Sequence, residues 1–251
     1  MDPITITAAS GLRARLEALD LLANNMANLS SAGYKADRES YFTYISEEAA
    51  LAAALGASRP QPLSPVVEGQ WTDLSQGSLT PTGNPLDVAL SGPGFLVASS
   101  PTGPLLLRGG TLQLTPEGRL TTREGFELQL REPDRTLRAD PLLPIELDPS
   151  GTVHQNGLPL GELKIVAPPA PESLAKRQGV YFSLDARTLN DLPAARAELR
   201  QGVLESSNLG PAEAAVRLVN VLRQFETLQK AMQLGGEMNR KSVEEIARVH
   251  S

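Results

Sequence analysis

Both ends of the chain carry the same spacing of apolar residues, and this spacing limits what the chain can fold into. Near the start, steps of four and three separate Leu12, Leu16, Leu19, Ala23 and Met26. Near the end, the same steps separate Val221, Phe225, Leu228 and Met232. Such spacing places each set on one stripe of a helix. A helix over residues 7–29 would be roughly 33 Å long, and an apolar stripe of that length needs a partner in water.

The expected partner of the N-terminal helix is a second helix that begins near Pro211. Proline is accepted in the first helical turn because the N–H that it lacks would have no intrahelical acceptor there. The terminal helices are therefore expected to pair as a coiled coil. An ordinary core helix at each end is the alternative, because two heptads fall short of the sustained repeat that identifies a coiled coil.

Three asparagines lie near the end of the first helix: Asn24, Asn25 and Asn28. Asn24 and Asn28 are four residues apart and share a helix face. They could form hydrogen bonds across a helix interface, where a buried polar group fixes the register. Because Asn is a poor helix former, they could instead belong to a frayed and capped end. Gly33 then marks the exit from the helix, where a left-handed residue is common.

The sequence between the terminal helices changes character near residue 73. We interpret residues 36–72 as a connector, with an alanine-rich stretch at 46–55 that could form a short helix, followed by Pro60, Pro62 and Pro65. Residues 73–200 contain short apolar runs bounded by Gly, Pro and Asn, which is typical of short antiparallel strands. The clearest runs are 86–90, 95–98, 126–130 and 163–166.

Two similar stretches in this region, 114–120 (LTPEGRL) and 147–153 (LDPSGTV), predict hairpin turns. In each stretch Pro opens the turn, Gly accepts a positive φ near its end, and apolar residues resume afterwards. The predicted fold class is therefore α+β, with N- and C-terminal helices and an all-β central domain. The expected boundaries are an N-terminal helix in 1–35, a connector in 36–72, the β domain in 73–200 and a C-terminal helix in 201–251.

The sequence shows no pattern of catalytic residues. It has no cysteine, which excludes disulfides, thiolate nucleophiles and the usual zinc sites. The two histidines, His154 and His250, have no nucleophile or second ligand in the pattern around them. The turn at 91–94 (SGPG) lacks the remaining residues of a phosphate-binding loop and is interpreted as a turn between strands. We therefore expect no cofactor and no enzymatic activity.

Charge and hydropathy favour protein partners. The net charge is -6 and no run of Lys and Arg exceeds an adjacent pair, which argues against a nucleic-acid partner. No stretch approaches the length of a membrane-spanning helix, so we expect no direct membrane insertion. Residues 1–10 lack the basic and apolar regions of a cleavable secretory signal.

Three sequence blocks, taken together, resemble the flagellar axial proteins of bacteria, the rod and hook family of the basal body. The first block comprises 9–12 (ASGL), 19–28 (LDLLANNMAN) and 33–35 (GYK). The second comprises 82–90 (TGNPLDVAL), Gly92, Gly94, Phe95, and 108–110 (RGG) continuing to Leu120. The third comprises 201–209 (QGVLESSNL), with 223–226 (RQFE) and Lys230 behind it.

The blocks cover nearly the whole chain in the order and spacing of the family. Ser31 and Ala32 depart from the Thr-Pro that the family usually carries, and Leu228 stands where many members have Asn. The sequence at 223–226, the total length and the compact β region resemble the proximal-rod branch more than the distal-rod branch.

The resemblance implies a structural subunit whose terminal helices pair as a coiled coil lining the inner tube of the axial structure, with the β domain outside. The assembly interface implied in this way comprises Leu12, Leu16, Leu19, Asn24, Asn25, Asn28, Gly33, Tyr34, Lys35, Leu204, Asn208, Val221, Phe225, Leu228 and Met232. The implied partners are other rod subunits, copies of the same chain and the flagellar type III export apparatus. The implied location is the periplasmic rod, reached without cleavage of a signal peptide.

Two alternatives remain open on the sequence. One is a distal-rod or hook-type axial subunit, which would differ in the neighbours that it contacts. The other is a non-flagellar β-domain binding module with a helical oligomerisation stalk, for which a folded dimer with a ligand pocket would be diagnostic.

Overall fold

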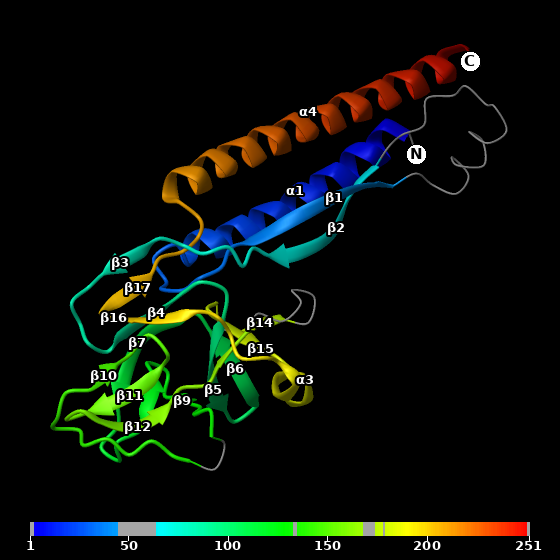
Figure 1. Cartoon of the computed structure of the whole chain (residues 1–251). Helices are drawn as coiled ribbons and strands as arrows, with labels where there is room; N and C mark the ends of the chain where they lie inside the picture. Colours follow the sequence, from blue (N-terminus) through cyan, green and yellow to red (C-terminus); the bar gives the residue numbers. More distant parts are fainter. Residues whose placement is uncertain (1–2, 45–63, 133–134, 168–173, 178, 250–251) are drawn as a thin grey trace. The chain divides into compact units, whose positions relative to one another are not determined.

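The computed structural model describes residues 3–44, 64–132, 135–167, 174–177 and 179–249 (Figure 1). The chain divides into two compact units. The terminal-helix unit takes its described residues from 1–26, 37–71 and 211–251, and the β-rich unit takes them from 27–36 and 72–210. The chain therefore passes from one unit to the other four times, after residues 26, 36, 71 and 210.

The terminal-helix unit contains α1 (Pro3–Ala27), α4 (Pro211–Val249), β1 (Asp37–Tyr44) and β2 (Ser64–Thr72). The last residues of α1 and of β2 already belong to the β-rich unit. The predictions of a helix at each end and of a helix start at Pro211 are confirmed. β1 and β2 pair in a two-stranded sheet.

The two strands β1 and β2 lie at the ends of the stretch that we expected to be a connector. The sequence of β1 contains Tyr, Phe and Thr, which favour strands, and the proline of β2 is its second residue, where proline is tolerated. The short helix expected at 46–55 lies outside the described residues, as do Pro60 and Pro62.

The β-rich unit contains three sheets within its described residues. The largest has the strand order β14-β15-β6-β5-β9-β8-β7-β4-β16, with β13 also paired to β5. The others are β10-β11-β12 and β17-β3, and the paired strands of all three are antiparallel.

The strands of this unit are short and most are joined by tight turns. Their bounds are β3 Leu79–Pro81, β4 Asp87–Ser91, β5 Phe95–Ser100, β6 Gly103–Leu107, β7 Gly109–Leu114, β8 Leu120–Thr122, β9 Glu127–Leu128, β10 Glu146–Leu147, β11 Thr152–Gln155, β12 Leu158–Glu162, β13 Ile165–Val166, β14 Ala175–Arg177, β15 Tyr181–Ser183, β16 Glu198–Gln201 and β17 Val203–Glu205. A short helix, α3 (Ala186–Asp191), interrupts them, so the central region is β-rich rather than all-β.

Both predicted hairpin turns are confirmed. Leu114 of β7 faces Leu120 of β8 across the first turn, and Leu147 of β10 faces Val153 of β11 across the second. The glycine of each turn, Gly118 and Gly151, has the positive φ expected from the sequence.

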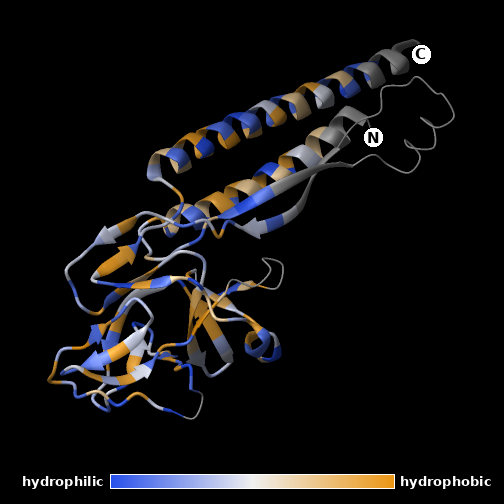
Figure 2. Cartoon of the chain, viewed as in Figure 1, coloured by the Kyte–Doolittle hydropathy of each residue, from blue (hydrophilic) through white to orange (hydrophobic). Residues whose placement is uncertain are grey.

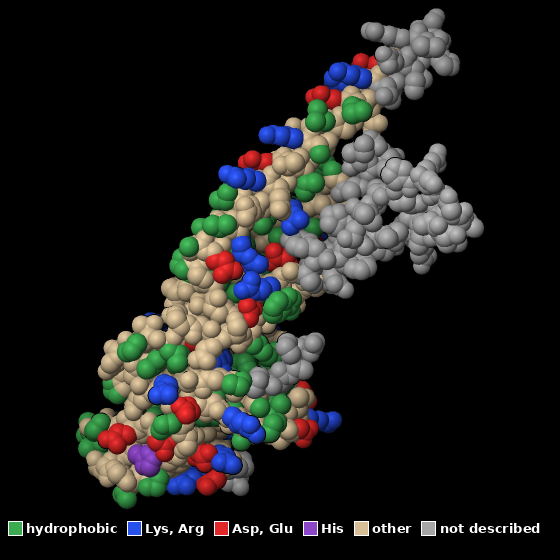
Figure 3. Space-filling model, turned by 45° about the horizontal axis from the view of Figure 1, so that its top comes forward, with side chains coloured by type: hydrophobic (Ala, Val, Ile, Leu, Met, Phe, Trp, Pro, Cys, Tyr) green, Lys and Arg blue, Asp and Glu red, His purple; other side chains and the backbone are tan. Residues whose placement is uncertain are grey.

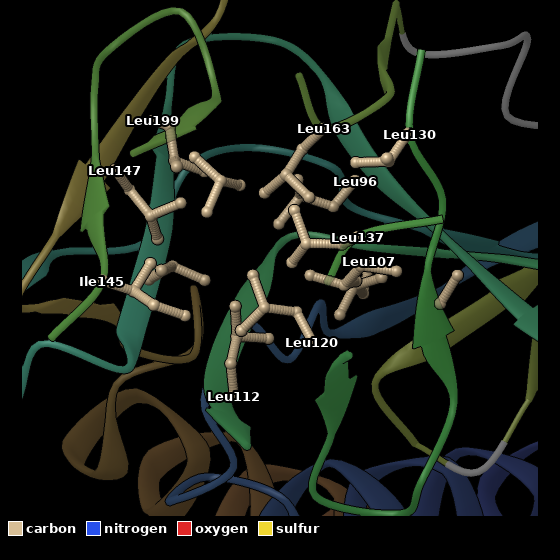
Figure 4. Packing of buried hydrophobic residues seen from close by; sticks show 14 of the residues in the cluster. Leu96, Leu107, Leu112, Leu120, Leu130, Leu137, Ile145, Leu147, Leu163 and Leu199 are labelled. Carbon is tan, nitrogen blue, oxygen red and sulfur yellow. The ribbon is translucent and has the colours of Figure 1, made fainter. Parts of the chain in front are cut away.

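β5 and β6 are buried on both faces. Leu96 and Leu107 belong to a large cluster of buried apolar side chains (Figure 4). Phe95 and Leu106 belong to a second cluster around Phe182, whose ring meets that of Phe95 edge-on with centroids 5.6 Å apart. Strands buried on both sides lose the alternation of polar and apolar residues, which explains the continuous apolar run at 95–98.

Candidate functional site

A buried carboxylate lies at the end of β17, where it receives hydrogen bonds from three segments of the β-rich unit. Glu205 is 1% exposed. Its Oε1 accepts from Lys35 Nζ at 2.5 Å and from the Gly77 N–H at 2.9 Å, and its Oε2 accepts from Arg108 Nε at 3.0 Å. One carboxylate thus pairs with two buried cations, and breaking such an arrangement by removing one partner is strongly destabilising.

The Lys35 ammonium is in direct contact with the Glu205 carboxylate. Its side chain is fully buried, and its ammonium also donates to the Ser75 carbonyl at 2.6 Å. Burial lowers the pKa of Lys35 below the ordinary lysine value, while the hydrogen bond and the charge of Glu205 oppose that decrease.

Arg108, between β6 and β7, is held by main-chain carbonyls as well as by Glu205. Its guanidinium donates to the carbonyls of Gly92, Gly94 and Leu90. The first two carbonyls belong to the turn at 91–94, which joins β4 to β5 as the sequence predicted. The turn therefore presents oxygens to an arginine, whereas a phosphate-binding loop would present N–H groups to an anion.

Asn208 connects the same segments through its side-chain amide. Its Oδ1 accepts from the Ala36 N–H at 2.8 Å, and its Nδ2 donates to the Asp73 carbonyl at 2.7 Å and to Ser75 Oγ at 3.1 Å. We call the set Lys35, Ser75, Gly77, Arg108, Glu205 and Asn208 the polar clasp. All its members except Arg108 lie within a few residues of three of the four crossings between the units.

The clasp includes several residues that the sequence placed in an assembly interface. Lys35 and Asn208 are members, Gly33 donates its N–H to the Glu205 carbonyl at 2.7 Å, and Tyr34 is fully buried beneath the Lys176 ammonium. Leu204 pairs with Thr80 in the β17–β3 sheet. In this chain Tyr34 and Lys35 are buried within the β-rich unit, and their part in an assembly interface stays a prediction.

Glu205 and Arg108 were absent from the predicted interface although both stand in the blocks that carry the family resemblance. A local pattern could not pair them with Lys35, because 170 residues separate Lys35 from Glu205. The sequence signal that could have pointed to these two residues is a single charged residue among apolar or small ones, such as Glu205 after Val203 and Leu204.

The three asparagines near the end of α1 have different surroundings, and Asn28 already belongs to the β-rich unit. Asn25 is fully buried, and its side chain pairs with the main chain of Asp37 at the start of β1. Asn24 is exposed, and Asn28 accepts from the Ser31 hydroxyl at 3.3 Å just after the helix. The buried amide therefore binds a strand, while the pair that shares a face, Asn24 and Asn28, is not buried.

The buried face of α1 differs from the predicted stripe. It consists largely of small residues: Ala8, Gly11, Ala14, Ala18, Leu21, Leu22 and Asn25. Of the predicted stripe, Leu12 and Leu19 are half-buried, whereas Leu16, Ala23 and Met26 are exposed. Small residues allow close approach of neighbouring backbone but give a weak hydrophobic signal, so the larger side chains misdirected the face assignment.

The predicted stripe of α4 is half-buried along its length: Val221, Phe225, Leu228 and Met232. Beside it the helix exposes further apolar side chains: Val216, Val219, Leu222, Leu234 and Met238. Hydrophobic and hydrophilic residues alternate along α4 (Figure 2), and its visible face mixes hydrophobic with charged side chains (Figure 3). α4 thus retains apolar surface after the chain has folded.

The described residues contain no cluster of three or more His, Asp or Glu side chains that could hold a metal ion. None of the described helices is both long and apolar enough to span a membrane.

Comparison with known proteins identifies the family. Residues 7–35 match the family described as flagella basal body rod protein, and residues 200–245 match the C-terminal family of the flagellar basal body rod FlgEFG proteins. The flagellar basal-body rod protein FlgF of Caulobacter vibrioides is 30% identical over 233 residues, covering 92% of this chain and 93% of the relative. The chain belongs to the flagellar basal-body rod protein family.

Other relatives in the rod family include both FlgF and FlgG proteins. FlgF of Salmonella typhimurium is 29% identical over 247 residues, covering 92% of this chain and 93% of the relative. FlgG of Buchnera aphidicola subsp. Schizaphis graminum is 26% identical over 260 residues, covering 96% of this chain and 98% of the relative. As a rod-family member, the chain is a structural protein of the flagellar basal body and not an enzyme.

The two segments matched to the rod families meet in the clasp. The N-terminal match ends at Lys35, and the C-terminal match includes Glu205 and Asn208. The ion pair between Lys35 and Glu205 therefore joins the two family segments inside the β-rich unit.

Proposed function

We propose that this rod-family protein assembles through its terminal helices into the axial tube of the flagellar rod, with α1 and α4 paired as a coiled coil. The tube transmits torque and carries exported subunits, and the chain contacts other rod subunits and copies of itself in the periplasm. Within the family it occupies the proximal-rod position.

The observation that carries this proposal is the apolar surface that remains on the helices. Leu16 of α1 is 47% exposed, and α4 exposes Val219 and Leu222. An extended apolar surface on a folded chain commonly marks a site of protein–protein contact. Head-to-tail contacts that do not close into a ring generate a helical assembly, which fits a rod.

The test is complementation of a strain that lacks this chain. We expect the deletion to stop basal-body assembly at the rod and to abolish motility, and the wild-type chain to restore both. Leu16→Asp should fail to restore them, because it places a charge on the proposed contact surface. Ser30→Asp adds the same charge at an exposed position in the turn after α1 and serves as the control. Normal rods in the deletion strain would overturn the proposal.

We also propose that the chain leaves the cytoplasm unfolded through the flagellar type III apparatus, without signal cleavage. The resemblance of the sequence to the flagellar axial proteins supports this route. The chain recovered from basal bodies should have the mass of the uncleaved chain and should be missing when the export apparatus is inactive. Recovery only from the cytoplasm of motile cells would contradict export.

A further part of the proposal is that α1 and α4 are loosely held before assembly and become ordered in the rod. The exposed apolar residues of both helices support this view, since helices gain most of their stability from packing. Amide exchange in the purified monomer should be fast in both helices and slow in β5 and β6. Strong protection of both helices in the monomer would contradict the idea.

A distal-rod or hook-type subunit is the second candidate, favoured by the full-length match to FlgG relatives. Site-specific cross-linking from Leu222 in assembled rods separates the two positions, because each has different neighbours along the rod. The non-flagellar binding module is set aside because the chain belongs to the rod family.

A further inference from the structure

We propose that Glu205 is a positioning residue that makes docking of the N-terminal family segment conditional on the presence of the C-terminal family segment. In this view residues 30–36 are held in the β-rich unit only when Glu205 occupies its place at the end of β17. The inference concerns the isolated chain and does not depend on how the rod assembles.

The two cations that share Glu205 differ in their other hydrogen-bond partners. Among the residues that the structure describes, the Lys35 ammonium has two hydrogen-bond partners, the Glu205 carboxylate and the Ser75 carbonyl. Arg108 keeps three carbonyl acceptors besides Glu205 and also lies 5.8 Å from the centre of the Phe95 ring. Without Glu205, Arg108 keeps three acceptors, whereas Lys35 keeps one hydrogen-bond acceptor, the Ser75 carbonyl, and the weaker attraction of the Asp73 charge.

A buried ammonium that loses the carboxylate in contact with it is strongly unfavourable, and in this proposal the chain relieves the cost by moving Lys35 into water. Moving Lys35 also displaces its neighbours in sequence, because the Ala36 N–H is bound by Asn208 and the Gly33 N–H is bound by the Glu205 carbonyl. Residues 30–36 would therefore leave as a segment, while β5 and β6 remain in place.

The same contacts define which part of the chain must be present. Glu205 and Asn208 both lie in the segment that leads to α4, and together they hold Lys35, Ala36, Ser75 and Gly77. While Glu205 and Asn208 are not yet in place, the chain can bury neither Lys35 nor the residues around it. The N-terminal segment thus docks last, after nearly the whole chain is available.

The test is peptide-level hydrogen exchange on the purified full chain with four variants. In Glu205→Gln, exchange at residues 30–36 should become more than about tenfold faster, with β5 and β6 unchanged. Both cations lose the carboxylate, but Arg108 keeps three carbonyl acceptors and Lys35 keeps one. Lys35→Met should have little effect, because Glu205 still pairs with Arg108 and the Gly77 N–H. Combining Lys35→Met with Glu205→Gln should restore slow exchange, because the poorly solvated ammonium is gone and Arg108 keeps its three carbonyl acceptors.

Glu162→Gln is the matched control, because Glu162 forms an exposed ion pair with Arg131. It should leave exchange at 30–36 unchanged. The proposal is overturned if the double variant exchanges as fast as Glu205→Gln, since a merely structural loss of packing would not be rescued by removing the lysine. It is equally overturned if Glu205→Gln leaves residues 30–36 protected or exposes β5 and β6 to the same degree.

A second measurement needs no variant and therefore holds even if Glu205→Gln fails to fold. Native-state exchange of the wild-type chain in low concentrations of denaturant should show residues 30–36 and 205–209 opening together as one cooperative unit, below the opening energy of β5 and β6. Independent opening of these two segments would overturn the proposal.

Discussion

Asn25 of α1 and Asp37 of β1, twelve residues apart, are joined by two hydrogen bonds between one side chain and one main-chain unit. Asn25 Nδ2 donates to the Asp37 carbonyl at 2.8 Å, and Asn25 Oδ1 accepts from the Asp37 N–H at 3.0 Å. Because Asn25 is fully buried, water cannot replace either bond. The pairing fixes the register between the last turns of α1 and the first residue of β1.

Replacing Asn25 should loosen β1 from α1. Asn25→Ala removes both of these hydrogen bonds to the Asp37 main chain, which costs roughly 2–4 kcal/mol of local stability. We expect faster amide exchange in residues 37–39 and a lower denaturant concentration for unfolding of this unit. Asn24→Ala, at the exposed neighbouring position, is the control and should change neither. Unchanged exchange in Asn25→Ala would show that the hydrogen bonds do not hold the strand.

Adding one methyl group at Gly77 should disturb the clasp. A Cβ at this position would lie 2.0 Å from the Ser206 carbonyl oxygen, which is too close for any side chain. Gly77→Ala should therefore destabilise the β-rich unit by about 2 kcal/mol or more, measured by urea unfolding. Gly210→Ala has open space around it and should change stability little. Equal unfolding midpoints for the two variants would contradict the close approach at Gly77.

The second hairpin turn should give the chain an acid-sensitive contribution to stability. Burial by itself raises the pKa of Asp148, but hydrogen bonds from the Ser150 hydroxyl, the Thr152 N–H, the His154 ring and the Ser150 N–H together hold it at about 2. Because the folded pKa lies below the usual value of 3.8, the stabilisation is present above about pH 4 and is lost as the pH falls through about 2.

Unfolding midpoints of the wild-type chain and of Asp148→Asn should therefore differ at pH 7 and converge near pH 2. Ser150→Ala, which removes one of the donors, should reduce the difference without abolishing it. A difference between the wild-type chain and Asp148→Asn that is constant from pH 7 to pH 2 would contradict the assignment.

Charged substitutions on α4 should distinguish positions needed for assembly from positions needed for folding. Val219 is 46% exposed, so Val219→Asp should leave the thermal unfolding of the monomer nearly unchanged while preventing rod assembly in cells. Ala214 is fully buried, so Ala214→Asp should destabilise the monomer itself by several kcal/mol, about 3 or more. Motility restored by Val219→Asp would exclude this face of α4 from the assembly surface.

The sequence predicted best where the cause of a structure is local. Pro211 starts α4, and Gly118 and Gly151 sit in the hairpin turns, because each position depends on a few neighbouring residues. The face of α1 was predicted less well, because burial there follows Ala14 and Ala18 rather than the larger Leu16.

The clasp could not be predicted because it is made from distant segments. No local pattern shows that Lys35, Arg108 and Glu205 meet, or that the carbonyls of the 91–94 turn complete the surroundings of Arg108. All three residues lie in the sequence blocks that resemble the family, so the resemblance identified the positions but not the contacts between them.

Lys35, Arg108 and Glu205 come from separate parts of the chain. This restricts which hybrids of two rod proteins can fold. A graft that replaces residues 37–204 keeps both Lys35 and Glu205 but removes Arg108. The inserted segment must then supply a hydrogen-bond donor to Glu205 Oε2 in place of Arg108. A graft that replaces only residues 205–251 removes the partner of both cations at once. Exchange of modules between rod proteins should therefore succeed when the acceptor and the donor carry matching charges at these three points, whatever their overall identity.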